Sequence, residues 1–215
     1  MTAIKNIIFD LGAVLLNIDY DGPAKMLENL GVKNFNAHYS KATQTKLFDN
    51  LERGVINPEQ FRSEFNKITD LNFSDALLDK VWNSIILDFP LKRLELIVNL
   101  KSYYKTFLLS NTNKIHYDFY TAKLNNLGYS WEKLFHASFF SHEMGLRKPD
   151  KEIFFKALNL ASLSPNETLF IDDLPANVKA AEACGMHTIW LNENTDLVDL
   201  FEMDTNLGRL VPKFQ

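Results

Sequence analysis

The chain has 215 residues, of which 46% are hydrophobic and 23% are charged, and its formal net charge is −4. These values are typical of a globular protein with its own apolar core and exclude a largely disordered chain. The acidic excess is not offset by any basic cluster, which disfavours nucleic-acid binding. A small anionic ligand would therefore be held by local positive groups or by a metal ion.

The first predicted element is a short apolar strand over residues 5–9 that ends at Asp10. Four later apolar runs are also predicted to be strands, over 106–109, 137–140, 169–171 and 188–191. Helical spacing of apolar residues separates them, over 91–102, 150–160 and 176–184. Strands that alternate with helices predict an α/β fold with a doubly wound, Rossmann-like parallel sheet, in which all strands end at one edge.

Residues 18–90 interrupt this alternation. They show helical patterns over 58–68 and 74–87, the second with Ser74 as N-cap, and no convincing buried strand. A crossover connection of about 70 residues would be far too long. We therefore expect a core formed by residues 1–17 and 91–215, and a small helical domain, residues 18–90, inserted after the first strand.

Cys184 is the single cysteine, so an intramolecular disulfide cannot form. It lies in the apolar helical stretch before Gly185, which predicts a buried structural thiol. No segment approaches the roughly 18 apolar residues that a membrane span requires. The first residues also lack the cleavage site of a signal peptide. We expect a cytoplasmic protein with no membrane partner.

Polar side chains follow the predicted strands. They are Asp10, Ser110 and the pair Asp172–Asp173, with Lys148 in a short loop after the third strand. In parallel sheets these strand ends share one edge, where ligands bind. Carboxylates suit a hard divalent cation, and magnesium is the natural choice when phosphate is the other ligand. A hydroxyl and an ammonium would hold phosphate oxygens, and one carboxylate is left to act as a nucleophile.

Each of these residues also has a purely structural interpretation. An Asp or Ser after a strand often closes a turn or caps the next helix. Ser110 would then cap the helix that begins near Lys114, and Asp172–Asp173 the helix near Pro175, while Lys148 would be a solvated loop residue. Their joint occurrence in this order favours a shared site.

Four motifs carry a resemblance to the haloacid dehalogenase superfamily of phosphohydrolases. They are Ile-Ile-Phe-Asp-Leu-Gly-Ala-Val-Leu (7–15), Leu-Leu-Ser-Asn-Thr (108–112), Gly-Leu-Arg-Lys-Pro-Asp (145–150) and Phe-Ile-Asp-Asp (170–173). The resemblance covers nearly the whole chain, and the first motif is similar to that of bacterial sugar-phosphate phosphatases. It implies a helical cap domain at 18–90 and Mg²⁺-dependent hydrolysis of a small phosphorylated metabolite.

The resemblance also implies the metal ligands. Asp10 would be the nucleophile that forms an aspartyl-phosphate, and its other oxygen would bind Mg²⁺. The backbone carbonyl of Gly12 and the side chain of Asp173 would complete the protein ligands. Asp172 would be either a second ligand or a carboxylate just outside the coordination sphere.

The same resemblance implies the phosphate-binding groups. The hydroxyl of Ser110 and the backbone N–H of Asn111 would bind phosphate oxygens. Lys148 would lie beside the nucleophile and the phosphate and reduce their mutual repulsion. Within the predicted cap, Tyr20, Glu52 and Arg53 are candidates to face the site. Of these, Arg53 would bind a second anionic group on the substrate.

Gly12 departs from the family pattern. Phosphatases of the family usually carry at this position an aspartate that acts as general acid and then base, which is typically worth about 10²–10⁴-fold. Three hypotheses follow: a phosphatase branch with glycine here, a catalytically weak ligand-binding or regulatory protein, or a metal-independent 2-haloacid dehalogenase. The pair Asp172–Asp173 disfavours the last. Asp19 would supply the missing acid only if its loop folds back toward Asp10.

Overall fold

The structure is a computed structural model that describes residues 3–32, 39–40, 43–44, 46–69, 72–205 and 207–213. At its centre lies a five-stranded parallel sheet with the strand order β5-β4-β1-β6-β7. The strands are β1 (Asn6–Phe9), β4 (Lys105–Ser110), β5 (Ala137–Phe140), β6 (Thr168–Asp172) and β7 (His187–Trp190). All five predicted strands and the predicted doubly wound parallel sheet are confirmed, with small shifts of the strand bounds.

Strand β1 shows why these short apolar runs form strands. All four of its residues are buried, as expected for a central parallel strand that helices cover on both faces. Its register places Phe9 beside Leu108 of β4 and Ile171 of β6. The polar residues that follow these strands therefore emerge at the same edge of the sheet.

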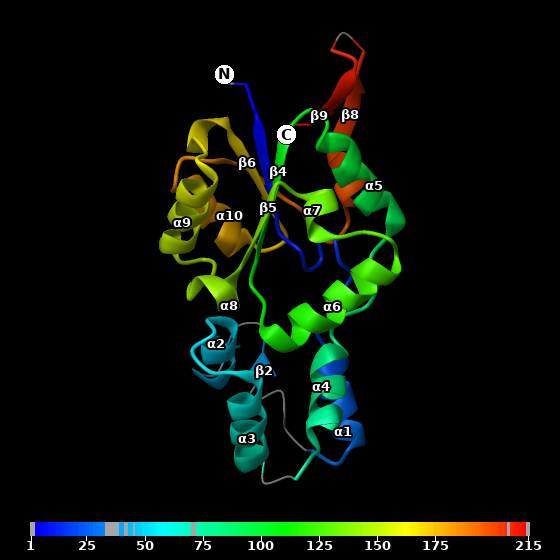
Figure 1. Cartoon of the computed structure of the whole chain (residues 1–215), viewed down its shortest axis with the longest axis vertical. Coiled ribbons are helices and arrows are strands. Elements are labelled where there is room, and N and C mark those ends of the chain that lie inside the picture. The colour runs from blue at the N-terminus through cyan, green and yellow to red at the C-terminus, as the bar shows by residue number, and fades with distance from the viewer. Residues whose placement is uncertain are drawn as a thin grey trace.

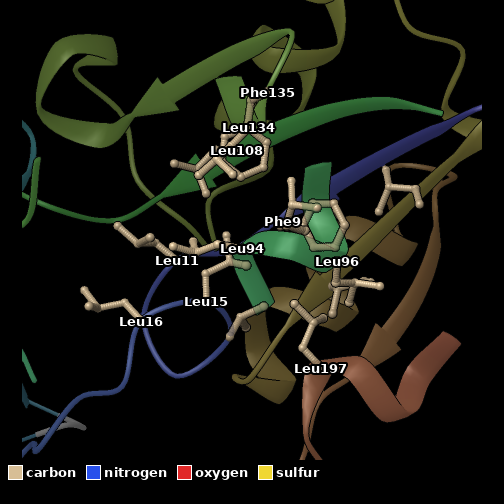
Figure 2. Packing of buried hydrophobic residues seen from close by; sticks show 14 of the residues in the cluster. Phe9, Leu11, Leu15, Leu16, Leu94, Leu96, Leu108, Leu134, Phe135 and Leu197 are labelled. Carbon is tan, nitrogen blue, oxygen red and sulfur yellow. The ribbon is translucent and has the colours of Figure 1, made fainter. Parts of the chain in front are cut away.

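Alternate residues of the strands supply two apolar layers. One layer contains Phe9 and Leu108 and packs on α5 (Leu91–Leu100), as Figure 2 shows for Phe9, Leu94 and Leu96. The other layer contains Ile8 and Phe170 and packs on α9 and α10. The remaining helices of this part are α6 (Lys114–Asn126), α7 (Trp131–Leu134), α8 (Ser141–Met144), α9 (Lys151–Ala161) and α10 (Pro175–Glu182). The helices predicted over 91–102, 150–160 and 176–184 are thus confirmed as α5, α9 and α10.

The segment after β1 gathers beyond the carboxyl ends of the strands (Figure 1). Its elements are α1 (Gly22–Asn29), β2 (Tyr39–Ser40), β3 (Thr43–Gln44), α2 (Lys46–Glu52), α3 (Pro58–Thr69) and α4 (Asp75–Asn83). The predicted helices over 58–68 and 74–87 are confirmed as α3 and α4, although α4 ends earlier than expected. The Ser74 hydroxyl accepts a hydrogen bond from the Leu77 N–H at 3.3 Å, as expected of an N-cap.

This segment has its own apolar cluster, which contains Leu27, Phe48, Phe61 and Trp82. Aromatic rings hold it together: Phe48 and Trp82 stack with their centroids 4.9 Å apart, and Phe61 lies 5.3 Å from Trp82. A separate cluster is what an independent folding unit needs. It favours the division at residues 18–90, which stays a prediction.

The sequence patterns did not predict the last two strands. Strands β8 (Phe201–Asp204) and β9 (Arg209–Pro212) form an antiparallel pair of their own, after the short 3₁₀ helix η3 (Leu197–Leu200). A second 3₁₀ helix, η2 (Pro165–Glu167), precedes β6. Because Met203 and most neighbouring side chains of the pair are exposed or half-buried, no continuous apolar run marks these strands.

Two smaller predictions concern single features of the chain. Cys184 is a free, buried cysteine, which confirms the prediction of a buried thiol. Burial raises the pKa of this thiol, so its reactive thiolate form is disfavoured. Within the described residues, no helix is both long enough and apolar enough to cross a bilayer.

Candidate active site

A cavity of about 500 Å³ opens at the carboxyl ends of the central strands. One wall comes from the strand ends and the loops that follow them. The opposite wall comes from the segment after β1, including Tyr20, Glu52 and Trp82. The cavity brings together most of the predicted site residues: Asp10, Gly12, Ser110, Asn111, Lys148 and Asp173. Tyr20 and Glu52 also line it, whereas Asp172 lies behind it and Arg53 lies outside its lining.

Asp10 is positioned by the end of β1. Its backbone N–H donates to the carbonyl of Ile171 at 2.9 Å, which continues the strand ladder by one bond. The chain then turns tightly, since the N–H groups of Leu15 and Leu16 both donate to the carbonyl of Leu11. Ala13 adopts a φ of 59°, a left-handed conformation that is costly for a residue with a Cβ. The turn keeps Gly12 against the cavity, next to Asp10.

Lys148 is buried between two carboxylates. Its Nζ donates to Oδ1 of Asp10 at 2.6 Å and to Oδ2 of Asp172 at 2.6 Å, and 1% of its side chain is exposed. Burial opposes the ammonium form, but the charges of Asp10 and Asp172 outweigh it and raise the pKa of Lys148. The lysine is therefore charged, and the interpretation as a solvated loop residue is wrong.

The carboxylates outnumber the cation that they share. Atoms of Asp10, Asp172 and Asp173 that are able to bind a metal all lie within 4.8 Å of one another. Burial raises the pKa of Asp10 to about 7; Lys148 opposes this shift, while Asp172 and Asp173 add to it. Three carboxylates against the Lys148 ammonium leave two negative charges, which a divalent cation would balance. The oxygen-only donor set fits Mg²⁺.

The hydrogen bonds of Asp172 distinguish it from the other two acids. Asn177 donates to both of its oxygens at 3.0 Å, and the backbone N–H of Leu174 donates to Oδ1 at 2.8 Å. Together with Lys148, these donors occupy the carboxylate, which is fully buried. The hydrogen bond from the Leu174 N–H closes a turn after β6, which is the structural role that the sequence also allowed for Asp172. The geometry favours a place for Asp172 outside the coordination sphere, where it orients Lys148.

Ser110 and Asn111 follow β4. The N-cap of α6 is Asn113, whose side chain accepts from two backbone N–H groups, so the capping interpretation of Ser110 is wrong. The Asn111 side chain makes a two-way contact with Lys148: its amide donates to the Lys148 carbonyl, and its oxygen accepts from the Lys148 N–H, both at 2.8 Å. The family resemblance implies a role only for the Asn111 backbone.

Gly12 does not adopt a left-handed conformation, and a Cβ added to it would lie 3.4 Å from Ile18. A side chain at this position is therefore compatible with the backbone. The geometry gives no support to Asp19 as a replacement for the missing acid at Gly12. Its carboxylate accepts from the backbone N–H of Asp21 at 3.0 Å and lies 3.5 Å from Lys25. Asp19 is not part of the cavity lining, and its contacts are those of a loop carboxylate.

Arg53 is held away from the cavity by ion pairs with Asp49 at 2.9 Å and Asp150 at 2.8 Å. The geometry therefore gives no support to a contact between Arg53 and a substrate. The arginine that lines the cavity is Arg147, which sequence analysis missed. It pairs with Glu52 at 3.0 Å and with Asp49 at 3.4 Å, so its charge is balanced within the protein.

His116, which none of the sequence motifs indicates, lines the cavity from the first turn of α6. No catalytic motif contains this position. A usable signal was the helix expected to begin near Lys114. Its first turn lies at the edge of the sheet where β4 ends, next to Ser110.

Comparisons with known proteins agree with this geometry. A family model described as haloacid dehalogenase-like hydrolase matches residues 4–185. The chain is 28% identical over 198 residues to D-ribitol-5-phosphate phosphatase of Bacteroides thetaiotaomicron, covering 90% of this chain and 94% of the relative. It is 28% identical over 194 residues to a sesquiterpene phosphatase of Aspergillus oryzae, covering 90% and 92%.

Solved structures give the same result. A haloacid dehalogenase family enzyme of Bacteroides thetaiotaomicron, in complex with magnesium and inorganic phosphate, is 33% identical to the chain. It superposes with a TM-score of 0.86, which covers 93% of this chain and all of that one. A hydrolase of the same family from Porphyromonas gingivalis is 29% identical, with a TM-score of 0.85 and coverage of 92% and 96%.

Proposed function

The chain belongs to the haloacid dehalogenase-like hydrolases, and from that premise we propose that it is a Mg²⁺-dependent phosphatase of small polyol or sugar phosphates. The observation that carries this proposal is the buried group formed by Asp10, Lys148 and Asp173 at the base of the cavity. Two relatives named as phosphatases support the class of reaction, and the one named for D-ribitol 5-phosphate supports the class of substrate.

In the proposed reaction, a carboxylate oxygen of Asp10 attacks phosphorus while the bond from phosphorus to the leaving alcohol breaks. Water then cleaves the phosphoryl group from Asp10 and releases inorganic phosphate. The Lys148 ammonium, fixed by Asp172, reduces the repulsion between the nucleophile and the anionic substrate. The Ser110 hydroxyl and the Asn111 N–H would bind phosphate oxygens.

The proposed metal ligands are the side chains of Asp10 and Asp173 and the backbone carbonyl of Gly12, with Asp172 behind them. When bound, Mg²⁺ supplies positive charge that neutralises the phosphoryl oxygens. Gly12 leaves the position of the usual acid open, because a Cβ there would approach only Ile18 within 4 Å. We propose that a water molecule in this space gives its proton to the leaving oxygen, and that the hydroxide left behind attacks the phosphorus of the aspartyl-phosphate in the second step.

The test is release of phosphate from D-ribitol 5-phosphate and from p-nitrophenyl phosphate with Mg²⁺. We expect turnover that EDTA abolishes and that the substitution Asp10→Asn lowers by at least about 10³-fold, because the amide is not a nucleophile. Asp19→Asn is the matched control, since it makes the same change outside the cavity lining and should leave turnover unchanged. Equal turnover by the wild-type and Asp10→Asn proteins would refute the proposal.

A further inference from the structure

His116 lines the same cavity as Asp10 but has no part in the proposed chemistry. Its ring contacts two residues of α4, Asn83 and Trp82, although His116 itself belongs to α6. Nδ1 lies 3.0 Å from Oδ1 of the buried Asn83. The ring stacks on Trp82, with centroids 5.3 Å apart and planes inclined by 10°. These contacts fix both the position and the orientation of the imidazole.

The contact with Asn83 also assigns the proton of the ring. A carbonyl oxygen only accepts hydrogen bonds, so Nδ1 carries the hydrogen and Nε2 presents a lone pair. Burial lowers the pKa of His116 to about 3, which leaves the imidazole neutral near pH 7. No described residue makes a hydrogen bond with Nε2. His116 is therefore a fixed, uncharged acceptor in the wall of the cavity.

The surroundings of His116 indicate what kind of group it would accept from. Apolar side chains form much of the lining of the cavity that His116 shares, among them Ile18, Ile85 and Ile86. The cation Arg147, which lines the same cavity, is already paired with carboxylates. A second phosphate or a carboxylate on the substrate would meet no unpaired positive charge among these residues, and the lone pair of Nε2 would repel it. A hydroxyl group on a carbon chain is the donor that fits.

We propose that His116 determines substrate specificity by accepting, at Nε2, a hydrogen bond from a hydroxyl of the organic part of the substrate. This proposal rests on the proposed phosphatase function and extends it. Asn83 and Trp82 are positioning residues, because they hold the ring without contacting substrate. The site is then selective for phosphate esters of polyols over esters of plain alcohols, since a bound ester without hydroxyls would cover Nε2 and offer it no donor.

The experiment compares two esters that have the same five-carbon chain and a primary leaving group. D-Ribitol 5-phosphate carries hydroxyls along this chain, whereas n-pentyl phosphate carries none. The substitution His116→Phe keeps a flat ring against Trp82 and removes the acceptor. We expect kcat/KM for the ribitol ester to fall about 10- to 100-fold and kcat/KM for the pentyl ester to stay unchanged, so that the ratio between them collapses.

Two further variants make this result specific. His116→Gln places an amide oxygen that accepts in the same region, and it should restore part of the ratio. It also repeats the comparison if His116→Phe does not fold. His187→Phe, at the start of β7 and outside the cavity lining, is the matched control and should leave both esters unaffected.

An equal loss for both esters would overturn the proposal, because it would place His116 in the chemistry or in folding. An unchanged ratio would also overturn it, since the hydroxyls would then be recognised elsewhere. Failure of the phosphatase proposal is separate: the wild-type protein would release no phosphate from either ester or from p-nitrophenyl phosphate with Mg²⁺.

Discussion

Asp10 and Asp172 are both aspartates that accept a hydrogen bond from Lys148, but their other surroundings differ. Both oxygens of Asp172 accept hydrogen bonds from several donors. Its carboxylate is therefore fixed in place, where it orients Lys148. Asp10 receives one bond from Lys148 and otherwise faces the cavity. Its carboxylate is therefore the one that is able to meet a substrate. The number of surrounding donors, rather than residue type, separates the proposed nucleophile, Asp10, from Asp172.

The open position at Gly12 leads to a prediction at the same scale. We expect Gly12→Asp to raise kcat for n-pentyl phosphate by up to about 10²-fold, because an alkoxide leaving group needs a proton in the transition state. The rate for p-nitrophenyl phosphate, whose leaving group is a weak base, should change little. Both rates are measured by release of phosphate with Mg²⁺. A loss of activity toward both esters would mean that the new carboxylate disturbs the metal site instead.

The convergence of most candidate site residues in one cavity was predictable from the sequence, and the reason is geometric. Asp10, Ser110 and Asp173 follow strands that a parallel sheet aligns, so order along the chain implies proximity in space. The two hydrogen bonds between the Asn111 side chain and the Lys148 backbone were not predictable, because a contact between distant loops leaves no periodic signal in the sequence. The ion pairs of Arg53 with Asp49 and Asp150 were not predictable for the same reason.

At the scale of elements, the contact of α2 with α8 joins the helical segment to the loop that carries Lys148. Gly54 ends the turn after α2 with a φ of +65°, and a Cβ added to it would lie 2.1 Å from the carbonyl oxygen of His142. Two ion pairs also join these parts of the chain, from Arg53 to Asp150 and from Arg147 to Glu52. The backbone can come this close only because residue 54 has no side chain.

We therefore expect Gly54→Ala to lower the free energy of unfolding by about 3 kcal/mol, from the left-handed φ and from displacement of α8 together. Gly128→Ala is the matched control, since Gly128 has a φ of +79° and open space around it. It should lower the free energy of unfolding by only about 1 kcal/mol. Urea unfolding measures both variants, and equal losses would show that the close approach to His142 is not a constraint.

The elements themselves were predictable in proportion to how completely they are buried. Strands β1 and β6 are buried along their whole length, so an unbroken apolar run marked each of them. The pair β8–β9 is mostly exposed or half-buried, and its strands carry polar and charged residues without a clear period. In such strands the structure depends on backbone pairing, and the sequence of side chains gives little indication of it.

At the scale of the whole molecule, one carboxylate ties the C-terminal part of the chain to α5. Asp196 accepts from Arg93 at 3.1 Å, pairs with Lys92 at 3.0 Å and caps η3. Burial by itself would raise the pKa of Asp196, but the bonds from Arg93 and Lys92 outweigh it and lower the pKa to about 2. The folded state therefore binds this proton more weakly than the unfolded chain.

A lowered pKa adds stability that is complete above the unfolded value of about 4 and is lost as the pH falls toward 2. We expect Asp196→Asn, which keeps the capping oxygen, to lower the free energy of unfolding by about 2 kcal/mol at pH 7 and by about half of that at pH 3. Asp199→Asn, an exposed position of the same 3₁₀ helix, is the control and should have little effect. A difference that does not shrink with pH, measured by urea unfolding, would exclude this origin.

The stacking of His116 on Trp82 also has a consequence for recombination between this chain and its relatives. His116 belongs to α6, whereas its two supports, Asn83 and Trp82, belong to α4. A chimera that takes residues 18–90 from a relative would import new supports and leave the old imidazole behind. Recombination at this boundary would thus separate the acceptor from the residues that aim it, and selectivity would be inherited only when both halves come from one parent.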